Sequence, residues 1–367
     1  MEGNGSKKIF ITPVELAVLL IAITIGIEST SLPNTINKLA KQDAWIATAL
    51  GALYPLYVVI IAIFFSKRFP DDNILTLSKK YFGKYLSTFL NVIFALGFLT
   101  YLPGVISSGA IIFKTYVIAY MGFPKIYIVT VIFIIFAVSR GLKVLGRVSI
   151  INFFIILFIL VTSLAILRKG SYLNVLPIFG SGIKNIIKAS FITSYTYAGI
   201  EFIFLLYPHL QDKSKLKKSA LGTVAFIAFF YTWIVFVSMY YMGTDIVAKS
   251  IWPFFTATEA IQLEVINSFR FIFIFLWMIV TLVDIAALYY FNFDLAGQII
   301  NIDKKIIFHV VVGGLIVLVA NKYYSDRLLR ASITEKTSLF STAYNFVYIT
   351  IIFLFSVIKK GDSSEKA

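Results

Sequence analysis

The stretch "IGIESTSLPN", from Ile25 to Asn34, lies inside a segment long enough to cross a lipid bilayer, yet it is rich in polar residues. A continuous helix in hydrocarbon is expected to exclude such residues, because every polar group there needs a partner within the protein. Gly26 permits non-helical backbone, and Pro33 cannot donate a helical hydrogen bond but can begin a new helix. We therefore predict that the first membrane span is interrupted here, with hydroxyls of Ser29 to Ser31 capping freed backbone groups. The alternative is a proline-kinked helix without a site.

The rest of the chain has the composition of a membrane protein. Of its 367 residues 59% are hydrophobic, and several long stretches carry no charge. A helix needs about 20 apolar residues to cross the hydrocarbon core of a bilayer. The alternating pattern of a membrane β-barrel, the other architecture that satisfies its own backbone in lipid, is absent. The sequence therefore predicts an all-α polytopic membrane protein.

We predict ten transmembrane helices, five in each half of the chain. The predicted spans cover residues 13–39 (interrupted), 44–65, 85–116, 126–142, 148–167, 189–207 (interrupted), 220–242, 271–293, 306–320 and 339–358. Because five is an odd number, the second half is expected to cross the membrane in the opposite sense, as an inverted repeat. On this division, residues 13–168 form the first repeat, and residues 169–358 form the second repeat with its preceding outer loop.

The charged residues predict the orientation of the chain. The formal net charge is +15, and with the N-terminus inside, more than half of the 33 Lys and Arg residues lie in inner segments. Cytoplasmic loops are enriched in these residues, so we expect cytoplasmic tails at 1–12 and 359–367. Basic residues spread over short loops, with no nucleic-acid-binding motif, do not indicate a nucleic-acid partner. The absence of cysteine excludes disulfides and cysteine-based sites.

A second interruption is predicted in the sixth span, at "SYTYAGIE" from Ser194 to Glu201. Each interruption falls in the first span of a five-span half. Paired breaks at matching positions are the best sequence indication of a transporter-type binding site. The physical reason is that unwound backbone at membrane depth is tolerated only where it lines a cavity or is buried in protein. The ends of the half-helices then present partial charges to an ionic group.

Four acidic residues lie within or beside the spans, where ionisable groups are costly and mark functional candidates. Glu15, near the inner end of the first span, fits either surface anchoring or function. Glu28, inside the first break, either lines the site or holds the unwound segment by hydrogen bonds. Glu201 can accept hydrogen bonds from freed N–H groups, and we favour that structural or gating role over ligand contact. Asp284, in the middle of the eighth span, is expected to face a cavity or a buried partner.

Three acids with few basic residues at the same depth favour a cavity suited to an amine group or a cation. Tyr197 lies in the second break, and Tyr101, two residues before Pro103, is a candidate for the cavity wall. The chain has no HExxH motif, no paired histidine ligands and no serine-nucleophile elbow. We therefore expect no enzymatic chemistry, no metal and no cofactor.

The order and spacing of several motifs resemble the B subunit of GerA-type spore germinant receptors. These proteins are also called endospore germination permeases and belong to the amino acid–polyamine–organocation superfamily. The motifs are "TIGIESTSLPN", "FGKYL", "LPIFGSGI", "GIEFIFLLYPHL" and "IWP", together with Trp277 in the eighth span. The resemblance covers nearly the whole chain. One departure is Glu28, which stands where the family commonly has a small residue and so narrows the pocket and adds negative charge.

The resemblance implies a leucine-transporter-like fold with discontinuous helices 1 and 6, in the inner membrane of a spore. It implies that the protein binds a small nutrient germinant, an amino acid or other amine-bearing solute, and signals to an A and a C subunit to trigger germination. Spans three and eight are expected to supply walls of the pocket. The residues that map to this ligand site are Gly26, Ile27, Glu28, Ser29, Thr30, Ser31, Tyr101, Tyr197, Ala198, Gly199, Glu201, Val283 and Asp284.

Two other functions stay open at this point. The same fold serves proton-coupled secondary amino acid transporters, in which Glu28, Glu201 or Asp284 would carry the proton. A purely structural membrane subunit without a ligand is the third possibility.

Overall fold

The computed structural model describes residues 10–261, 269–299 and 305–358, which form a bundle of helices. The predicted tails, 1–12 and 359–367, lie almost entirely outside these residues. The α-helices are α1 (Pro13–Thr24), α2 (Leu32–Ala40), α3 (Ala44–Gly51), α4 (Leu53–Arg68), α5 (Ile74–Tyr116), α6 (Phe123–Val138), α7 (Leu142–Ser163), α8 (Ile183–Ser194), α9 (Ile203–Leu206), α10 (Leu216–Lys249), α11 (Pro253–Ala257), α12 (Phe269–Ile299), α13 (Lys305–Val319) and α14 (Arg327–Ile358). One isolated β-bridge joins Ile11 to Leu210.

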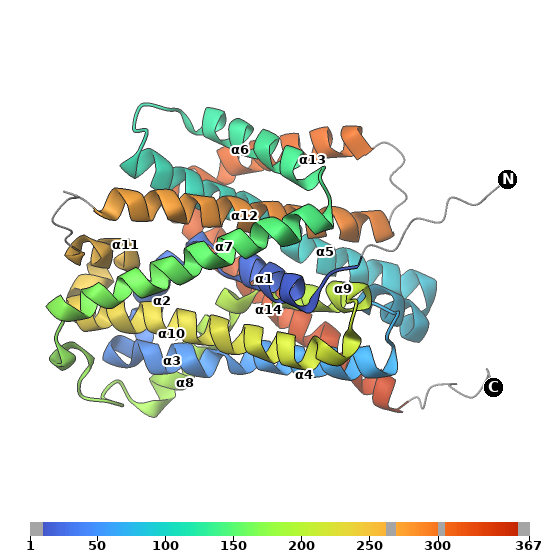
Figure 1. Cartoon of the computed structure of the whole chain (residues 1–367), viewed down its shortest axis with the longest axis horizontal. Helices are drawn as coiled ribbons and strands as arrows, with labels where there is room; N and C mark the ends of the chain where they lie inside the picture. Colours follow the sequence, from blue (N-terminus) through green and yellow to red (C-terminus); the bar gives the residue numbers. More distant parts are fainter. Residues whose placement is uncertain (1–9, 262–268, 300–304, 359–367) are drawn as a thin grey trace.

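The long helices run side by side along the long axis of the molecule, with α1 near the centre (Figure 1). α1 packs against α7, α10 and α12, whereas α5 packs against α12 and α14. The first helix begins and the last helix ends at the same end of the bundle. An even number of crossings has this consequence, so the arrangement agrees with the predicted even number.

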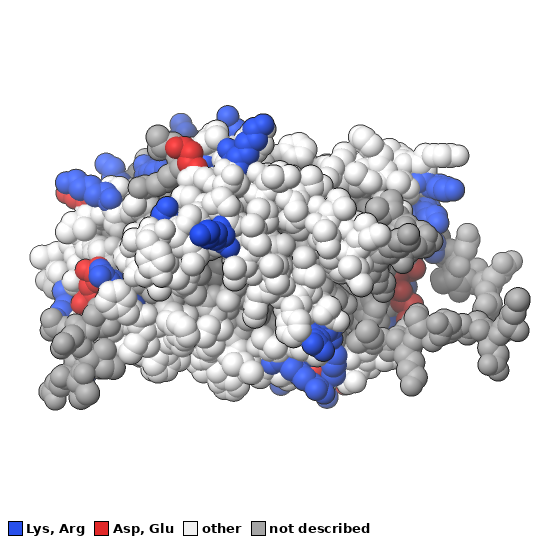
Figure 2. Space-filling model, turned by 90° about the horizontal axis from the view of Figure 1, so that it is seen from above, with Lys and Arg blue, Asp and Glu red and all other residues white. Residues whose placement is uncertain are grey.

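The outer surface is apolar, as hydrocarbon requires. Uncharged atoms dominate the face shown in Figure 2, and Lys, Arg, Asp and Glu side chains stand on it in separate small groups. Large hydrophobic side chains are exposed along α6 and α7, among them Ile132, Phe136, Ile151 and Phe154. Such a surface is costly in water and is typical of helices that face lipid.

The described helices support a multi-span membrane protein. Seven helical segments are long and apolar enough to cross a bilayer, and the bent pair Ile183–Tyr197 and Ile200–His209 makes an eighth. Two shorter apolar helices, α1 and α6, complete the set. The all-α, multi-pass class predicted from the sequence is therefore confirmed, whereas the division into ten spans and two inverted repeats of five stays a prediction.

The last helix begins earlier than the sequence predicted. The predicted span started at residue 339, but α14 extends back to Arg327. That boundary was wrong because it was drawn at the edge of the uncharged stretch, whereas the preceding turns are helical and polar. The extension carries Arg330, of which only 8% is exposed, into the bundle.

Glu15 belongs to the cap of α1. Its Oε2 accepts from the backbone N–H of Thr12 at 2.7 Å, and its own N–H donates to Thr12 Oγ1 at 3.2 Å, which together form a capping box. Lys143 Nζ lies 2.8 Å from the same carboxylate oxygen. Glu15 therefore caps α1 and pairs with Lys143, a structural role rather than the surface anchoring considered from the sequence.

Candidate functional site

The first helix is interrupted where the sequence predicted. α1 ends at Thr24, Gly26 is fully extended, and a single 3₁₀ turn (Ile27–Thr30) leads into α2. The hydroxyls of Ser29, Thr30 and Ser31 donate to carbonyl oxygens three residues back, at 2.6, 2.7 and 2.9 Å. The hydroxyl run therefore caps the carbonyl groups of the unwound segment, as expected for side chains that compete with helical hydrogen bonds.

The sixth predicted span is also interrupted. α8 ends at Ser194, a 3₁₀ turn covers Tyr195–Tyr197, and Ala198 is extended. Gly199 then adopts φ 107°, a left-handed conformation that favours glycine. The two halves of the span meet at 50°.

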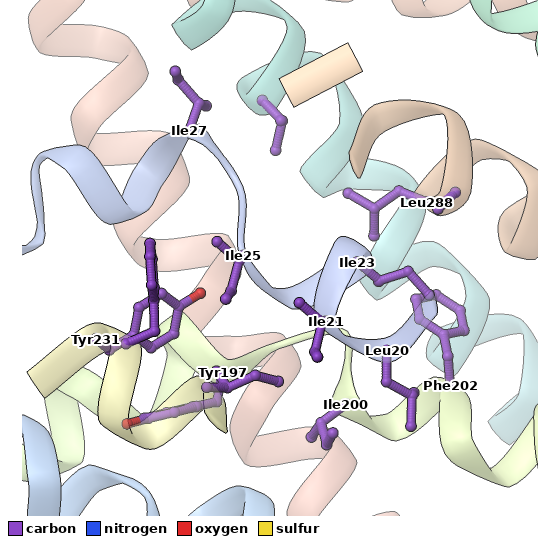
Figure 3. Close-up of a cluster of buried hydrophobic side chains, with 14 of the residues drawn as sticks. Leu20, Ile21, Ile23, Ile25, Ile27, Tyr197, Ile200, Phe202, Tyr231 and Leu288 are labelled. Atoms are coloured by element: carbon purple, nitrogen blue, oxygen red, sulfur yellow. The ribbon is translucent and has the colours of Figure 1, made fainter. Parts of the chain in front are cut away.

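The two breaks lie against each other (Figure 3). A Cβ atom on Gly199 would lie 2.8 Å from Ile23 Cγ2 and 3.0 Å from Ile23 O, so glycine is required both for the dihedral and for the contact. Tyr231 of α10 joins the same two segments: its hydroxyl donates to Thr24 O and lies 3.2 Å from Thr196 O. The hydroxyl of Tyr231 therefore contacts one carbonyl group from each break.

Tyr197 has a structural position beside this joint. It is fully buried, and its hydroxyl donates to Thr48 O in α3 at 3.2 Å. Its ring meets that of Tyr231 edge to face, with 5.1 Å between centroids. Sequence reasoning placed Tyr197 in the site, and the structure places it against the break, packed and hydrogen-bonded.

Glu28 projects from the first break into a charged group. Ser108 Oγ of α5 donates to Glu28 Oε1 at 2.5 Å, and Arg330 Nη1 of α14 donates to Ser108 Oγ. Arg330 Nη1 also lies 3.9 Å from Glu28 Oε1, with side-chain exposures of 10% for the arginine and 26% for the glutamate. Arg330 is thus one of the few basic residues at this depth, and its buried guanidinium compensates one acid.

Arg330 is the functional candidate that sequence reasoning missed. It precedes residue 339, the predicted start of the last span, so it was assigned to a loop. A signal did exist: Arg330 continues a row of polar residues at helical spacing, including Thr334, Ser341 and Asn345. A polar row at helical spacing indicates a helix face even where hydropathy is low.

Asp284 packs against the first break from α12. A Cβ atom on Gly26 would lie 2.1 Å from Asp284 Oδ2, so glycine leaves room for the carboxylate. Asp284 is 2% exposed, and its Oδ1 has no hydrogen-bond partner among the described residues. Val283, beside it, is buried as well. The structure therefore places Asp284 at the site, against the first break of the chain.

Glu201 is sealed by hydrogen bonds at the second break. Its Oε2 accepts from the backbone N–H of Gly199 at 2.8 Å. Its Oε1 accepts from Tyr54 Oη at 2.5 Å and from Asn345 Nδ2 at 3.2 Å. With no exposed surface, this carboxylate ties the break to α4 and α14. Of the alternatives considered for Glu201, the structural one fits this geometry.

A narrow hollow lies between the second break and helices α5, α12 and α14. It is small: about 20 Å³ is open to the centre of a water molecule, which is room for about one water. Three of the predicted site residues line it, namely Tyr101, Ala198 and Gly199. Neither Glu28 nor Asp284 is part of its lining.

The arrangement offers hydrogen-bond and charge recognition of a small solute. The first break lies beside the Glu28–Arg330 pair and the unpartnered Oδ1 of Asp284, and the second break borders the hollow. Within the described ranges, no cluster of three or more His, Asp or Glu side chains is placed to hold a metal ion.

Comparison with known proteins decides the family. The profile of the family described as "Spore germination protein" matches residues 10–327. The chain belongs to this family. The resemblance to B subunits of GerA-type germinant receptors, found from the motifs, is thereby confirmed.

Curated members of the spore germination protein family match over long stretches. Spore germination protein GerQB of Bacillus cereus is 21% identical over 362 residues, which cover 95% of this chain and 96% of the relative. Spore germination protein KB of Bacillus subtilis (strain 168) is 23% identical over 259 residues, which cover 68% of each chain.

A solved transporter shares the fold of this family member. The structure of a Na⁺-coupled sialic acid symporter, in a substrate-bound outward-open state, superposes with a TM-score of 0.62. The superposition covers 94% of this chain and 78% of the symporter, at 13% sequence identity. At this identity the likeness concerns the fold and not the solute.

Proposed function

We propose that the chain is the B subunit of a nutrient germinant receptor. It binds a small germinant, an amino acid or another amine-bearing solute, in a transporter-type pocket at its two helix breaks. It resides in the inner membrane of the spore with both termini in the cytoplasm, as ten spans in two inverted repeats of five. Binding is signalled to partner A and C subunits, which trigger germination.

The main support for this proposal is the contact between the two helix breaks in a member of the spore germination protein family. Ile23 and Gly199 are in contact, and Tyr231 faces carbonyl groups of both unwound segments. Unwound backbone is tolerated at membrane depth only where it is buried in protein or serves a cavity. The acids of the first break, Glu28 and Asp284, favour a solute that carries a positive or hydrogen-bond-donating group.

Signalling follows from the same geometry. A solute that contacts both breaks binds one arrangement of the half-helices better than another, and so shifts their equilibrium by its differential affinity. Glu201 and Tyr231 link the breaks to α4, α10 and α14, so a shift of the half-helices displaces these long helices. Partner subunits that pack on the outside of the bundle then read the displacement.

The test is germination of spores that carry variants of this chain. A panel of L-amino acids is applied to spores, and the fall in optical density is followed for the wild type, a deletion strain, and the Glu28→Gln and Glu15→Gln variants. We expect the deletion to abolish the response to at least one amino acid. Glu28→Gln is expected to raise the concentration needed for half-maximal response about tenfold, because a charged hydrogen-bonding group is lost near the solute.

Glu15→Gln is the matched control, because Glu15 lies in the same predicted span but caps α1 away from the breaks. It is expected to leave the concentration dependence unchanged. Equal shifts in both variants would remove Glu28 from the site, and an unchanged response in the deletion strain would end the receptor proposal.

A second function has one observation in its favour. Asp284 is a buried carboxylate whose Oδ1 lacks a hydrogen-bond partner within the described residues, as expected of a group that takes up and releases a proton. A proton-coupled amino acid transporter would use it. Uptake of radiolabelled amino acids into proteoliposomes under a proton gradient separates the two functions. Sustained accumulation that Asp284→Asn abolishes supports the transporter, and stoichiometric binding without accumulation supports the receptor.

A further inference from the structure

A row of polar side chains runs along α14 where it faces α5. The members, three or four residues apart, are Thr334, Thr337, Ser338, Ser341 and Asn345. Residues at this spacing share one face of a helix. The contact is close, since a Cβ atom on Gly97 would lie 3.0 Å from Ser341 Oγ. Small polar residues often serve helix packing in membranes, so the row marks a site only if its hydrogen-bonding capacity is not used up by packing.

Three residues of this row each donate a hydrogen bond and keep an oxygen that can accept one. Thr337 Oγ1 donates to Ile333 O at 2.8 Å, and Ser341 Oγ donates to Gly97 O at 3.4 Å. Asn345 Nδ2 donates to Glu201 Oε1. A hydroxyl that donates its one hydrogen still has lone pairs, and a carboxamide still has its oxygen. Each of these three side chains thus keeps an acceptor.

One of these acceptors is buried and has no partner. Asn345 is 2% exposed, and its Oδ1 finds no hydrogen-bond donor in the described part of the chain. Glu201 explains the orientation of the amide: a carboxylate only accepts, so it takes the NH₂ group and leaves Oδ1 on the other side. Burying an amide oxygen without a donor costs free energy, and such groups call for an explanation.

The acceptors border the hollow at the second break. Thr337, Ser341 and Asn345 are among the residues that line it, together with the predicted site residues Tyr101, Ala198 and Gly199. None of the residues that line it, all in the described part of the chain, is Lys, Arg, Asp or Glu. Recognition in this hollow therefore depends on hydrogen-bond direction more than on a formal charge.

We propose that α14 supplies a recognition wall for the solute, in which Asn345 Oδ1 and the hydroxyl oxygens of Thr337 and Ser341 accept hydrogen bonds from N–H donors. The inference rests on the proposed function and narrows it to solutes whose recognised end is an ammonium or amide N–H group. Anionic ends are disfavoured at this wall. Asn345 determines specificity, and Glu201 is a positioning residue that holds its amide.

The test uses the absence of cysteine from the chain. The full-length Ser341→Cys variant, purified in detergent micelles, is treated with 2-aminoethyl methanethiosulfonate or with 2-sulfonatoethyl methanethiosulfonate. In each case the thiolate of the variant forms a mixed disulfide and releases methanesulfinate. Each rate is divided by the rate of the same reagent with 2-mercaptoethanol. We expect the normalised rate to favour the ammonium reagent about tenfold, because acceptors surround the thiol.

Three further variants, made in the Ser341→Cys background, assign the preference to the wall. Asn345→Leu is expected to abolish it, and Thr337→Val, which keeps the shape but removes the hydroxyl, is expected to reduce it. Thr162→Val is the matched control, because Thr162 donates to Phe158 O four residues back in α7, away from the hollow. Monodispersity on size-exclusion chromatography shows that each variant is folded, and Thr337→Val still tests the wall if Asn345→Leu does not fold.

Equal normalised rates, a preference for the sulfonate reagent, or no reaction with either reagent would each overturn the recognition wall. None of these outcomes touches the receptor function itself. The receptor function is tested separately, by the response of spores to amino acids. It could still hold if other residues recognised the solute.

Discussion

Each helix break contains one glutamate, and the two carboxylates are held in opposite ways. Glu201, at the second break, is fully buried and accepts from three neutral donors. Glu28, at the first break, keeps 26% of its side chain exposed and meets Arg330 across Ser108. Hydrogen bonds from neutral donors in a buried site hold the backbone rigidly. A partly hydrated ion pair exchanges its partners more easily. We therefore expect the second break to stabilise the fold and the first break to change conformation more readily when a solute binds.

The glycines of the two breaks differ in the same sense. Gly199 has a positive φ and meets the backbone of Ile23, which cannot move away. Gly26 has an ordinary extended φ of −120°, and the three heavy atoms nearest to a Cβ atom built on it all belong to the carboxyl group of Asp284. The second break is therefore fixed by main chain and the first by a side chain.

The largest effect is expected from Glu201→Ala. The change leaves the donors of Gly199, Tyr54 and Asn345 without their acceptor in a buried site, and we expect a loss of about 3–5 kcal/mol in the free energy of unfolding. Thermal unfolding in detergent micelles, followed by tryptophan fluorescence, measures it as a lower Tm.

Glu335→Ala is the control for this change, because Glu335 is an exposed acid on α14. It is expected to alter stability by less than about 0.5 kcal/mol. If the Glu201→Ala and Glu335→Ala proteins unfold at the same temperature, the second break is not held rigidly by the hydrogen bonds of Glu201.

A smaller effect, with a different pattern of rescue, is expected from the glycines. Gly26→Ala and Gly199→Ala should each destabilise by about 2–3 kcal/mol, through a clash in the first case and through a clash plus backbone strain in the second. Adding Asp284→Ala should restore most of the loss in Gly26→Ala, because the clashing group is gone. Adding Ile23→Ala should not restore Gly199→Ala, since Ile23 O and the positive φ remain.

Gly222→Ala serves as the control, because nothing lies within 4 Å of a Cβ atom at this helical position. It is expected to be neutral or slightly stabilising, as for alanine in place of glycine within a helix. Rescue in both pairs, or in neither, would contradict the distinction between a break fixed by main chain and one fixed by a side chain.

The breaks themselves were predictable from the sequence, because their causes are local. Gly26, Pro33 and the hydroxyl run between them act on the backbone of the same turn, so a short motif is enough to predict an unwound segment. The same holds for Gly199 and for the capping box of Thr12 and Glu15. Apolar stretches of sufficient length likewise predicted the class of the fold.

The partners of the breaks were not predictable, because they are brought together only by packing. Arg330 meets Glu28 across most of the length of the chain, and Asn345 meets Glu201 from 144 residues away, so no local pattern pairs them. Hydropathy also misplaces the start of α14. Its row of threonines, serines and an arginine lowers the mean hydropathy, so the span is predicted to begin later than it does. The sequence therefore placed Glu28 in the first break but did not identify Arg330 as its partner.

The smallest effect is expected at the first break, in a double-mutant cycle of Glu28→Gln and Arg330→Gln. With 3.9 Å between the charged atoms and a serine hydroxyl between the groups, the pair is expected to couple by about 1 kcal/mol. Each single change leaves one charge without its counterpart, so the double variant should be more stable than the sum of the two predicts. The same thermal unfolding assay provides the four stabilities. The coupling should also shrink at high salt, because Glu28 is partly exposed and its interaction is screened. A coupling of several kcal/mol that salt does not change would instead describe a sealed pair, and the first break would then be as rigid as the second.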